Sequence, residues 1–297
     1  MVIRTREVER PRVALSELPG APTLTVASTN LPSLRPRLDL FGVLIDRVDR
    51  DTALDRIRGF LEDGRAHQIV TVNLDFIYLA EKDPVFRATI NQADLAVPDG
   101  MPLIWLSRVL GSPLAGRVTG VELVESSCHI ANRAGRGVFF LGSTPSVAVA
   151  AAAHVRERHP GLVVNVHAPP FGPISPAEDD RIIAMIQEAR PAFLFVALGA
   201  PRQDLWISAR RERLNVPVSM GVGCVLDLLA GTVRRAPPWM QSSGFEWSYR
   251  LMQEPGRLWR RYLIDDLPLF GRLSLMALDA HRMVKRGPGH SANGGFE

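Results

Sequence analysis

Short apolar segments recur along the middle of the chain, each followed by a small or polar loop and an amphipathic stretch. These segments span 41–48, 68–72, 94–97, 138–141, 162–166, 193–198 and 216–220. Helical periodicity lies between or after them at 51–62, 101–110, 120–134, 146–159, 176–189, 201–214 and 225–230. Nearly continuous apolar strands that alternate with helices indicate a parallel sheet covered on both faces. The expected fold is α/β, with a Rossmann-like, doubly wound and mostly parallel sheet.

The two ends of the chain depart from this pattern. Residues 1–37 are rich in proline and arginine without sustained periodicity, and we interpret them as a disordered basic leader. Residues 38–233 form the predicted α/β domain, and 287–297 a disordered tail. Between them, 234–286 reads as a helical appendage in which basic and aromatic residues alternate, which is typical of a helix at a membrane interface. A helix that packs its apolar face on its own domain is an equally open interpretation.

Composition narrows the class of protein. Of the 297 residues, 46% are hydrophobic and 22% charged, as in ordinary globular proteins. No apolar stretch approaches the roughly 20 residues that a membrane-spanning helix needs. Only 2 cysteines are present, which excludes a disulfide framework and favours a reducing compartment such as the cytoplasm. The net charge of +4 favours an anionic partner, whether phosphate, nucleic acid or lipid headgroup.

Polar residues and glycines follow the predicted strands. In an open parallel sheet, ligands bind beyond the carboxyl ends of the strands, so these residues are candidates for a shared site. Glycine at three of the junctions permits close approach of the backbone to a diphosphate. The candidates at the strand ends are Thr71, Asn73, Asp99, Gly142, Gln203, Gly221 and Gly223.

Three residues each allow a structural and a functional interpretation from the sequence alone. Asp99 precedes Gly100, as in a common turn, but a carboxylate at a strand end is also placed for general-base catalysis. Arg117 is either a surface arginine or an anion clamp. Gln203 is either a residue of a helix start or an amide that reads a ligand. These alternatives stay open at this point.

Familiar cofactor and metal motifs are incomplete. There is no P-loop, and Gly221-Val222-Gly223-Cys224-Val225-Leu226 has leucine where a dinucleotide fingerprint ends in glycine. Asp49-Arg50-Asp51 formally matches a D-x-D cation motif, but we favour helix capping there, with Asp51 as the N-cap. No H-E-x-x-H pair is present. We therefore predict neither a cofactor nor a metal.

Together these strings resemble the WecG/TagA/CpsF family of bacterial glycosyltransferases, over about residues 38–262. The matching strings are Thr71-Val-Asn73, 93–100 (ADLAVPDG), Arg117-Val-Thr119-Gly120, Phe140-Leu-Gly142, Gly199-Ala-Pro201-Arg-Gln203, Gly221-Val-Gly223, Arg234-Arg235-Ala236-Pro237 and Glu246-Trp247-Ser-Tyr249-Arg250-Leu251. Three positions depart from the usual pattern: Asp204 stands where glutamate is common, Arg202 where lysine is usual, and Cys224 where small residues are usual.

The resemblance implies a Rossmann-like fold of the GT-E type with a C-terminal appendage, and a metal-independent, inverting glycosyltransferase. The implied partners are a UDP-sugar donor, a polyprenyl-diphosphate-linked acceptor and an anionic membrane surface, without nucleic acid; a homo-oligomer is implied by other members. The donated sugar would be of the N-acetylmannosamine type, a uronic acid or a hexose. The enzyme would lie peripherally on the cytoplasmic face of the plasma membrane.

The same resemblance assigns roles to residues. Asp99 matches the candidate catalytic base. The family's other pocket positions match Thr71, Asn73, Arg117 and Gln203. The loops at Gly142, Gly221 and Gly223 would donate backbone hydrogen bonds to the diphosphate of the donor. Arg250, Arg257 and Arg260 match basic positions for the lipid diphosphate. Their spacing places them on one face if the helix is continuous, and a kink at Pro255 between them is the alternative.

Two rival functions are kept. A non-catalytic nucleotide-sugar-binding scaffold at the membrane would use the same pocket for binding alone. An NAD-dependent oxidoreductase would rest on the sheet topology only, without the fingerprint.

Overall fold

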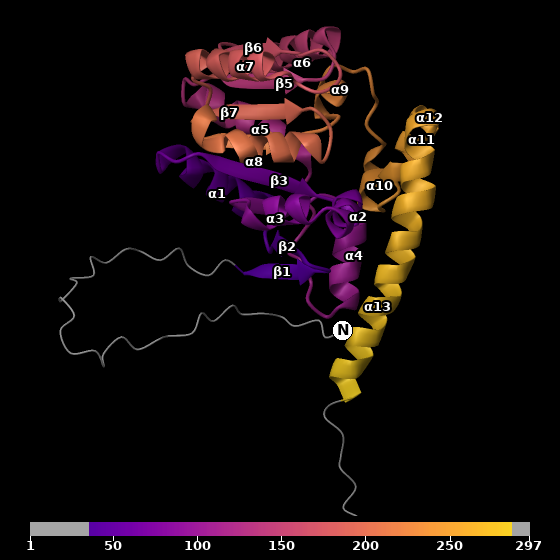
Figure 1. Cartoon of the computed structure of the whole chain (residues 1–297). Helices are drawn as coiled ribbons and strands as arrows, with labels where there is room; N and C mark the ends of the chain where they lie inside the picture. The colour runs from indigo at the N-terminus through magenta and orange to yellow at the C-terminus, as the bar shows by residue number, and fades with distance from the viewer. Residues whose placement is uncertain (1–35, 287–297) are drawn as a thin grey trace, which may run out of the picture.

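The computed structural model describes residues 36–286 (Figure 1). The disorder predicted for the two ends therefore falls almost wholly outside the described residues. The exceptions are Pro36 and Arg37, which were both assigned to the leader. Pro36 O accepts from Arg47 N–H over 3.1 Å, and Arg37 begins a β-strand.

Six strands form one parallel sheet, as predicted for a Rossmann-like fold. They are β3 (His67–Val72), β4 (Leu95–Pro98), β5 (Val138–Gly142), β6 (Val164–His167), β7 (Phe193–Ala197) and β8 (Val218–Gly221). Their order across the sheet is β4-β3-β8-β7-β5-β6, and every neighbouring pair is parallel. All carboxyl ends consequently meet at one edge, where ligands bind in folds of this kind.

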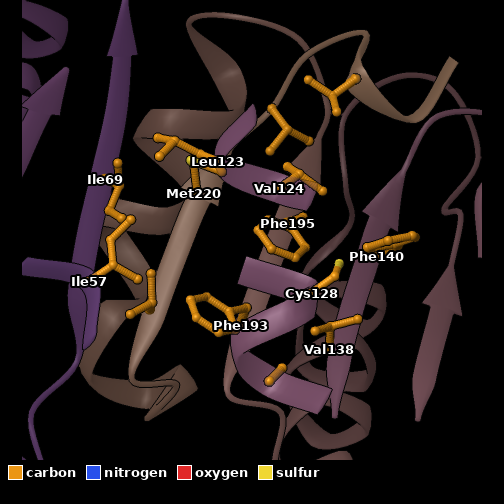
Figure 2. Packing of buried hydrophobic residues seen from close by; sticks show 14 of the residues in the cluster. Ile57, Ile69, Leu123, Val124, Cys128, Val138, Phe140, Phe193, Phe195 and Met220 are labelled. Atoms are coloured by element: carbon orange, nitrogen blue, oxygen red, sulfur yellow. The ribbon is translucent and has the colours of Figure 1, made fainter. Parts of the chain in front are cut away.

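Helices cover both faces of this sheet (Figure 1). One face packs against α1 (Arg50–Glu62), α5 (Gly120–Arg133), α6 (Pro145–Arg158) and α9 (Val225–Leu229). The other packs against α2 (Leu74–Lys82), α3 (Pro84–Gln92), α4 (Met101–Val109), α7 (Pro176–Ala189) and α8 (Arg202–Leu214). Figure 2 shows Phe140, Phe193 and Phe195 of the sheet against Leu123 and Cys128 of α5. Truncating such a buried phenylalanine to alanine typically costs about 3 to 5 kcal/mol, so this layer is a main source of stability.

The strand predicted at 41–48 contains β2 (Val43–Asp46), but its first two residues form a turn that was not predicted. The chain instead forms an antiparallel hairpin of β1 (Arg37–Leu40) and β2 (Val43–Asp46). Phe41 and Gly42 have φ of 57° and 88°, and the Gly42 N–H donates to Asp39 Oδ1 over 2.7 Å. Apolar residues on both arms, including Leu40 and Val43, complete the core beneath α4.

The appendage consists of four helices and a π-helical segment. These are α10 (Pro238–Ser242), α11 (Glu246–Gln253), α12 (Pro255–Trp259), η1 (Arg260–Asp266) and α13 (Leu267–Arg286). α13 lies along α4 (Figure 1) and buries Leu269 and Leu273 in the same core cluster as Val70 and Val72. The appendage thus packs on its own domain. No helix in residues 36–286 is long and apolar enough to cross a membrane.

Candidate active site

A cavity of about 720 Å³ opens at the carboxyl edge of the sheet. This volume lies in the range of small-molecule binding sites. Loops that follow β3, β4, β7 and β8 line it, together with the loop before α5 and parts of the appendage. The predicted residues in its wall are Thr71, Asn73, Asp99, Arg117, Gln203, Gly223 and Arg250. These seven residues come from six segments that are far apart in sequence and converge on one cavity.

Asp99 lies at the end of β4, against the start of α5. Its backbone N–H donates to Val72 O over 2.7 Å, and its Oδ2 accepts from Gly120 N–H over 3.2 Å. Gly120 is the first residue of α5, whose N-cap Thr119 forms a capping box with Glu122. The carboxylate therefore points at a helix N-terminus, where a negative charge is favoured.

Burial raises the pKa of Asp99 to about 6. The Gly120 hydrogen bond and the charge of Arg117 lower this pKa, whereas the charges of Glu246 and Glu122 raise it. A carboxyl with a pKa of about 6 is deprotonated at neutral pH yet close enough to that pH to accept a proton efficiently. The turn interpretation and the base interpretation of Asp99 are therefore compatible.

Thr71 and Asn73 form the part of the wall that β3 contributes. Thr71 is buried at the strand end. Asn73 is the N-cap of α2, and its Oδ1 accepts from Phe76 N–H over 3.2 Å. This cap fixes the Asn73 side chain at the cavity wall before any ligand enters.

Arg117 is held by a residue from the appendage. Its Nη1 lies 3.1 Å from Glu246 Oε2, and the two side chains are 17% and 25% exposed. Arg117 precedes α5, whereas Glu246 begins α11. Arg117 is thus a partly buried cavity arginine and not a surface one. No role was predicted for Glu246, although it lies in a string that carries the family resemblance.

Gln203 and Asp204 support the loop after β8. Gln203 is 2% exposed, and its Oε1 accepts from Gly223 N–H over 3.1 Å. Asp204 is fully buried beside it, and burial raises the pKa of Asp204 to about 7. A Cβ on Gly221 would lie 2.5 Å from Asp204 Oδ1 and 2.6 Å from Gln203 Nε2. Glycine is therefore required at 221 by this packing.

Gly142 and Gly221 do not belong to the lining residues. At Gly142 a Cβ would lie 2.5 Å from Ala197 O, so glycine permits the close approach of β5 and β7. Ser143 and Thr144, which follow Gly142, do line the cavity. The predicted donor contacts of the two glycines remain predictions, and the structure gives both a packing role.

The three arginines predicted for the lipid diphosphate lie in different settings. Arg250 lines the cavity, and its Nη2 donates to Cys224 Sγ over 2.9 Å. Arg260 is exposed and is not a lining residue, and Arg257 belongs to α12. The helix is interrupted at Glu254, where α11 ends and α12 begins. The single continuous helix on which the spacing argument depended is therefore absent from this part of the described chain.

A different arginine, Arg261, reaches the cavity wall. It pairs with Asp75 of α2 over 3.1 Å and with Asp266 over 3.8 Å. Burial raises the pKa of Asp266 to about 7. Arg261 was not predicted, since the wider turn of η1 changes which side chains share a face.

The D-x-D string has a structural role. Asp49, and not Asp51 as expected, is the N-cap of α1, and its Oδ1 accepts from Thr52 N–H over 2.9 Å. Within the described range, no group of three or more His, Cys, Asp or Glu side chains is placed to hold a metal ion.

At one edge of the doubly wound sheet lie a carboxyl group with a pKa of about 6, a cavity arginine and a helix N-terminus. This arrangement suits an enzyme that activates a hydroxyl beside an anionic leaving group. This is the class of the glycosyltransferases. The sequence model of the Glycosyl transferase WecG/TagA/CpsF family matches residues 38–282, and the chain belongs to this family.

Relatives of known name support the assignment. Proteins of Staphylococcus aureus strains MW2, MRSA252 and NCTC 8325 are each 30% identical to this chain over 236 residues, which cover 79% of this chain and 90% of each relative. All three are named N-acetylglucosaminyldiphosphoundecaprenol N-acetyl-beta-D-mannosaminyltransferase.

Proposed function

We propose that this protein is an inverting glycosyltransferase that moves a sugar from a UDP-sugar to a polyprenyl-diphosphate-linked saccharide, in the synthesis of a cell-surface or exopolysaccharide. The observation that carries the proposal is the position of Asp99, which shares one cavity with Arg117 and Gln203. The names of the relatives support the lipid-linked acceptor and favour an N-acetylmannosamine-type donor over a uronic acid or a hexose.

The chemistry is a single displacement. Asp99 takes the proton of the acceptor hydroxyl as that oxygen attacks the anomeric carbon, and UDP leaves from the opposite face of the sugar ring. One displacement at this carbon inverts its configuration. Hydrogen bonds from Arg117 and from backbone N–H groups at the strand ends would stabilise the diphosphate that develops charge. These donors supply the role that a metal ion has in other transferases, so we expect activity in the presence of EDTA.

The remaining predicted residues divide between donor and acceptor. Thr71, Asn73, Gln203 and Gly223 would contact the UDP-sugar, with the Gly142 and Gly221 turns shaping its site. For the acceptor diphosphate, Arg250 is the residue of the predicted three that lines the cavity. We assign Arg257 and Arg260, which the resemblance implies, to the same acceptor diphosphate.

We place the enzyme peripherally on the inner face of the plasma membrane. Nine of the large apolar side chains with high exposure lie in the appendage, namely Trp239, Phe245, Met252, Trp259, Leu263, Ile264, Leu267, Leu275 and Leu278. Together with arginines such as the exposed Arg260, they would enter the interface of an anionic membrane, to which each basic residue contributes about 1 kcal/mol.

A transfer assay tests the proposal directly. The purified protein is given a panel of UDP-sugars and an N-acetylglucosaminyl lipid diphosphate, and products are measured by mass spectrometry. We expect one UDP-sugar to be transferred, and Asp99→Asn to lower the rate by roughly 10² to 10⁴ while UDP binding is retained. Asp180→Asn, which alters an exposed carboxylate of α7, is the matched control.

The outcomes also separate the rival functions. Saturable UDP binding without transfer to any acceptor would indicate the scaffold instead. Normal turnover of Asp99→Asn would remove Asp99 from the mechanism. Thermal stabilisation by NAD would revive the oxidoreductase.

A further inference from the structure

The cavity changes in chemical character from one end to the other. The end that contains Asp99, Arg117 and Gln203 is polar. Between α4 and the appendage the wall carries a group of apolar side chains, with the ion-paired Asp75, Arg261 and Asp266 beside them. The apolar group consists of Met101, Pro102, Trp105, Phe245, Leu267 and Phe270. A nucleotide sugar has no apolar chain that would fill this second end.

Three segments are packed together to build the apolar end. The Gly244 backbone lies close to Trp105, so that a Cβ at 244 would be 2.5 Å from the indole ring. Phe270 of α13 meets the same indole edge-on, with ring centroids 6.1 Å apart. Trp105 of α4 thus joins the turn before α11 to the start of α13, and it forms a fixed apolar wall.

This apolar wall adjoins the polar end directly. Gly244, which packs on Trp105, is two residues before Glu246, which pairs with Arg117. The turn at 244–246 therefore contributes to both the apolar and the charged part of the cavity wall.

The apolar end also opens to the exterior. Phe245 and Leu267 line the cavity, yet they are 52% and 53% exposed. Leu263 and Ile264 of η1, shortly before Leu267, are exposed as well. Apolar side chains that continue from a cavity onto the surface mark a binding site for an apolar group.

We propose that the apolar end, formed by Trp105, Phe245, Leu267 and Phe270, binds the isoprenoid units of the lipid-linked acceptor that lie next to its diphosphate. The inference rests on the proposed function, because the acceptor supplies the occupant. In such an acceptor the saccharide, the diphosphate and the isoprenoid chain follow one another in a line. With the saccharide hydroxyl at Asp99, the chain leaves past the adjoining apolar wall and exits between Phe245 and Leu267.

Binding in the absence of membranes tests the inference. Isothermal titration calorimetry compares farnesyl diphosphate with methyl diphosphate on the full chain, below the concentration at which farnesyl diphosphate forms micelles. We expect farnesyl diphosphate to bind the wild type roughly tenfold more tightly or better, since burying two methylene groups is sufficient for that factor. Equal affinities for the two probes would overturn the inference.

Variants assign the site. Leu267→Glu and Phe245→Glu place a charge at the exit of the cavity, and both residues are exposed enough for the protein to fold. We expect each to reduce the preference for farnesyl diphosphate to less than about threefold. Leu275→Glu is the matched control, because Leu275 lies on α13, is 66% exposed and is not a lining residue. An equal loss in Leu275→Glu would assign the preference to the outer face of α13 and overturn the inference.

A transfer assay distinguishes this inference from the proposed function. Two acceptors share one saccharide diphosphate and differ only in a farnesyl or a methyl group. A lower KM for the farnesyl acceptor in the wild type but not in Leu267→Glu supports the apolar site. Transfer to both with the same KM overturns the inference while the proposed function stands. No transfer to either, with the calorimetric preference intact, contradicts the proposed function and leaves an apolar diphosphate site.

Discussion

Arg117 Nη1 lies 3.1 Å from Glu246 Oε2, and this ion pair joins the α/β domain to the first residue of the appendage helix α11. Both partners act on Asp99, and they act in opposite directions. The Arg117 charge lowers the pKa of Asp99, and the Glu246 charge raises it. The appendage thus contributes to the proton affinity of a carboxylate at the end of β4.

The first prediction uses these opposite effects. With Asp99 as the base, kcat/KM falls as the pH drops through about 6, the pKa of Asp99. Glu246→Gln removes a negative charge and is expected to move this acid limb to lower pH. Arg117→Gln removes a positive charge, moves the limb to higher pH and lowers the rate. The measurement is kcat/KM from pH 4.5 to 8. Glu178→Gln, which alters an ion pair with His167 away from the cavity, is the control and is expected to leave the acid limb in place. Shifts of the same sign in both cavity variants would contradict the assignment of the acid limb to Asp99.

The second prediction concerns Gly221. A methyl group at this position would overlap Asp204 and Gln203, so Gly221→Ala is expected to lower the free energy of unfolding by roughly 1 to 3 kcal/mol. Because Gln203 anchors Gly223, UDP affinity is expected to fall as well. Urea unfolding and UDP titration check both effects. Gly59→Ala is the control, since its Cβ would meet nothing within 4 Å and alanine favours the helix by about 0.5 to 1 kcal/mol. Unchanged stability of Gly221→Ala would contradict the packing role.

The third prediction concerns a buried histidine at the opposite edge of the sheet. His67 is fully buried between Asp63 and Asp94, at 2.9 Å and 3.2 Å. Burial lowers the pKa of His67, but the two carboxylates outweigh it, and the net pKa lies above the usual 6.5. The stabilisation is therefore complete below about pH 6.5 and is lost as the pH rises through the higher folded-state value.

His67→Gln tests this linkage. We expect a loss of roughly 2 to 3 kcal/mol at pH 5.5, because two partly buried carboxylates lose their charged partner. The difference from the wild type should shrink as the pH rises toward 9. Denaturant unfolding at several pH values measures it, with the exposed His129→Gln as control. A difference that is independent of pH would show that folding does not change the pKa of His67, and a difference that grows as the pH rises would show that His67 is neutral in the folded protein.

The fourth prediction uses the two cysteines as reporters of the cavity. Cys224 lines it, whereas Cys128 is buried in the core, where burial raises the pKa of its thiol to about 12. Iodoacetamide is expected to label Cys224 and spare Cys128, and UDP is expected to slow the labelling. Peptide mass spectrometry with time reads both sites. Faster or equal labelling in the presence of UDP would place the nucleotide elsewhere.

The order of strands and helices was largely predictable, because apolar strands buried on both faces have a distinctive pattern. The hairpin at 37–46 was missed since Phe41-Gly42 interrupts an apolar run that resembles one strand. Helices α2 and α3 were also not predicted. Their caps, Asn73 and Asp83, are recognisable signals, but Asn73 had been considered only as a ligand residue.

The site was predictable where it depends on the sheet. Thr71, Asn73, Asp99 and Gln203 follow parallel strands, whose ends must meet at one edge. The appendage residues were harder to predict, because Glu246 and Arg261 reach the cavity through tertiary packing that no local spacing records. Because the helix is interrupted at Glu254 and η1 is π-helical, α-helical spacing does not predict which side chains of this region share a face.

The residues that line the cavity are spread along the sequence from Thr71 to Phe270. During synthesis, the sheet edge that carries Asp99 leaves the ribosome long before α11 and α13 do. A nascent chain therefore has the base but neither Glu246 nor Phe270, and it acquires the complete cavity wall only after residue 270 has been made. The order of these segments along the chain thus delays activity until the appendage has been made.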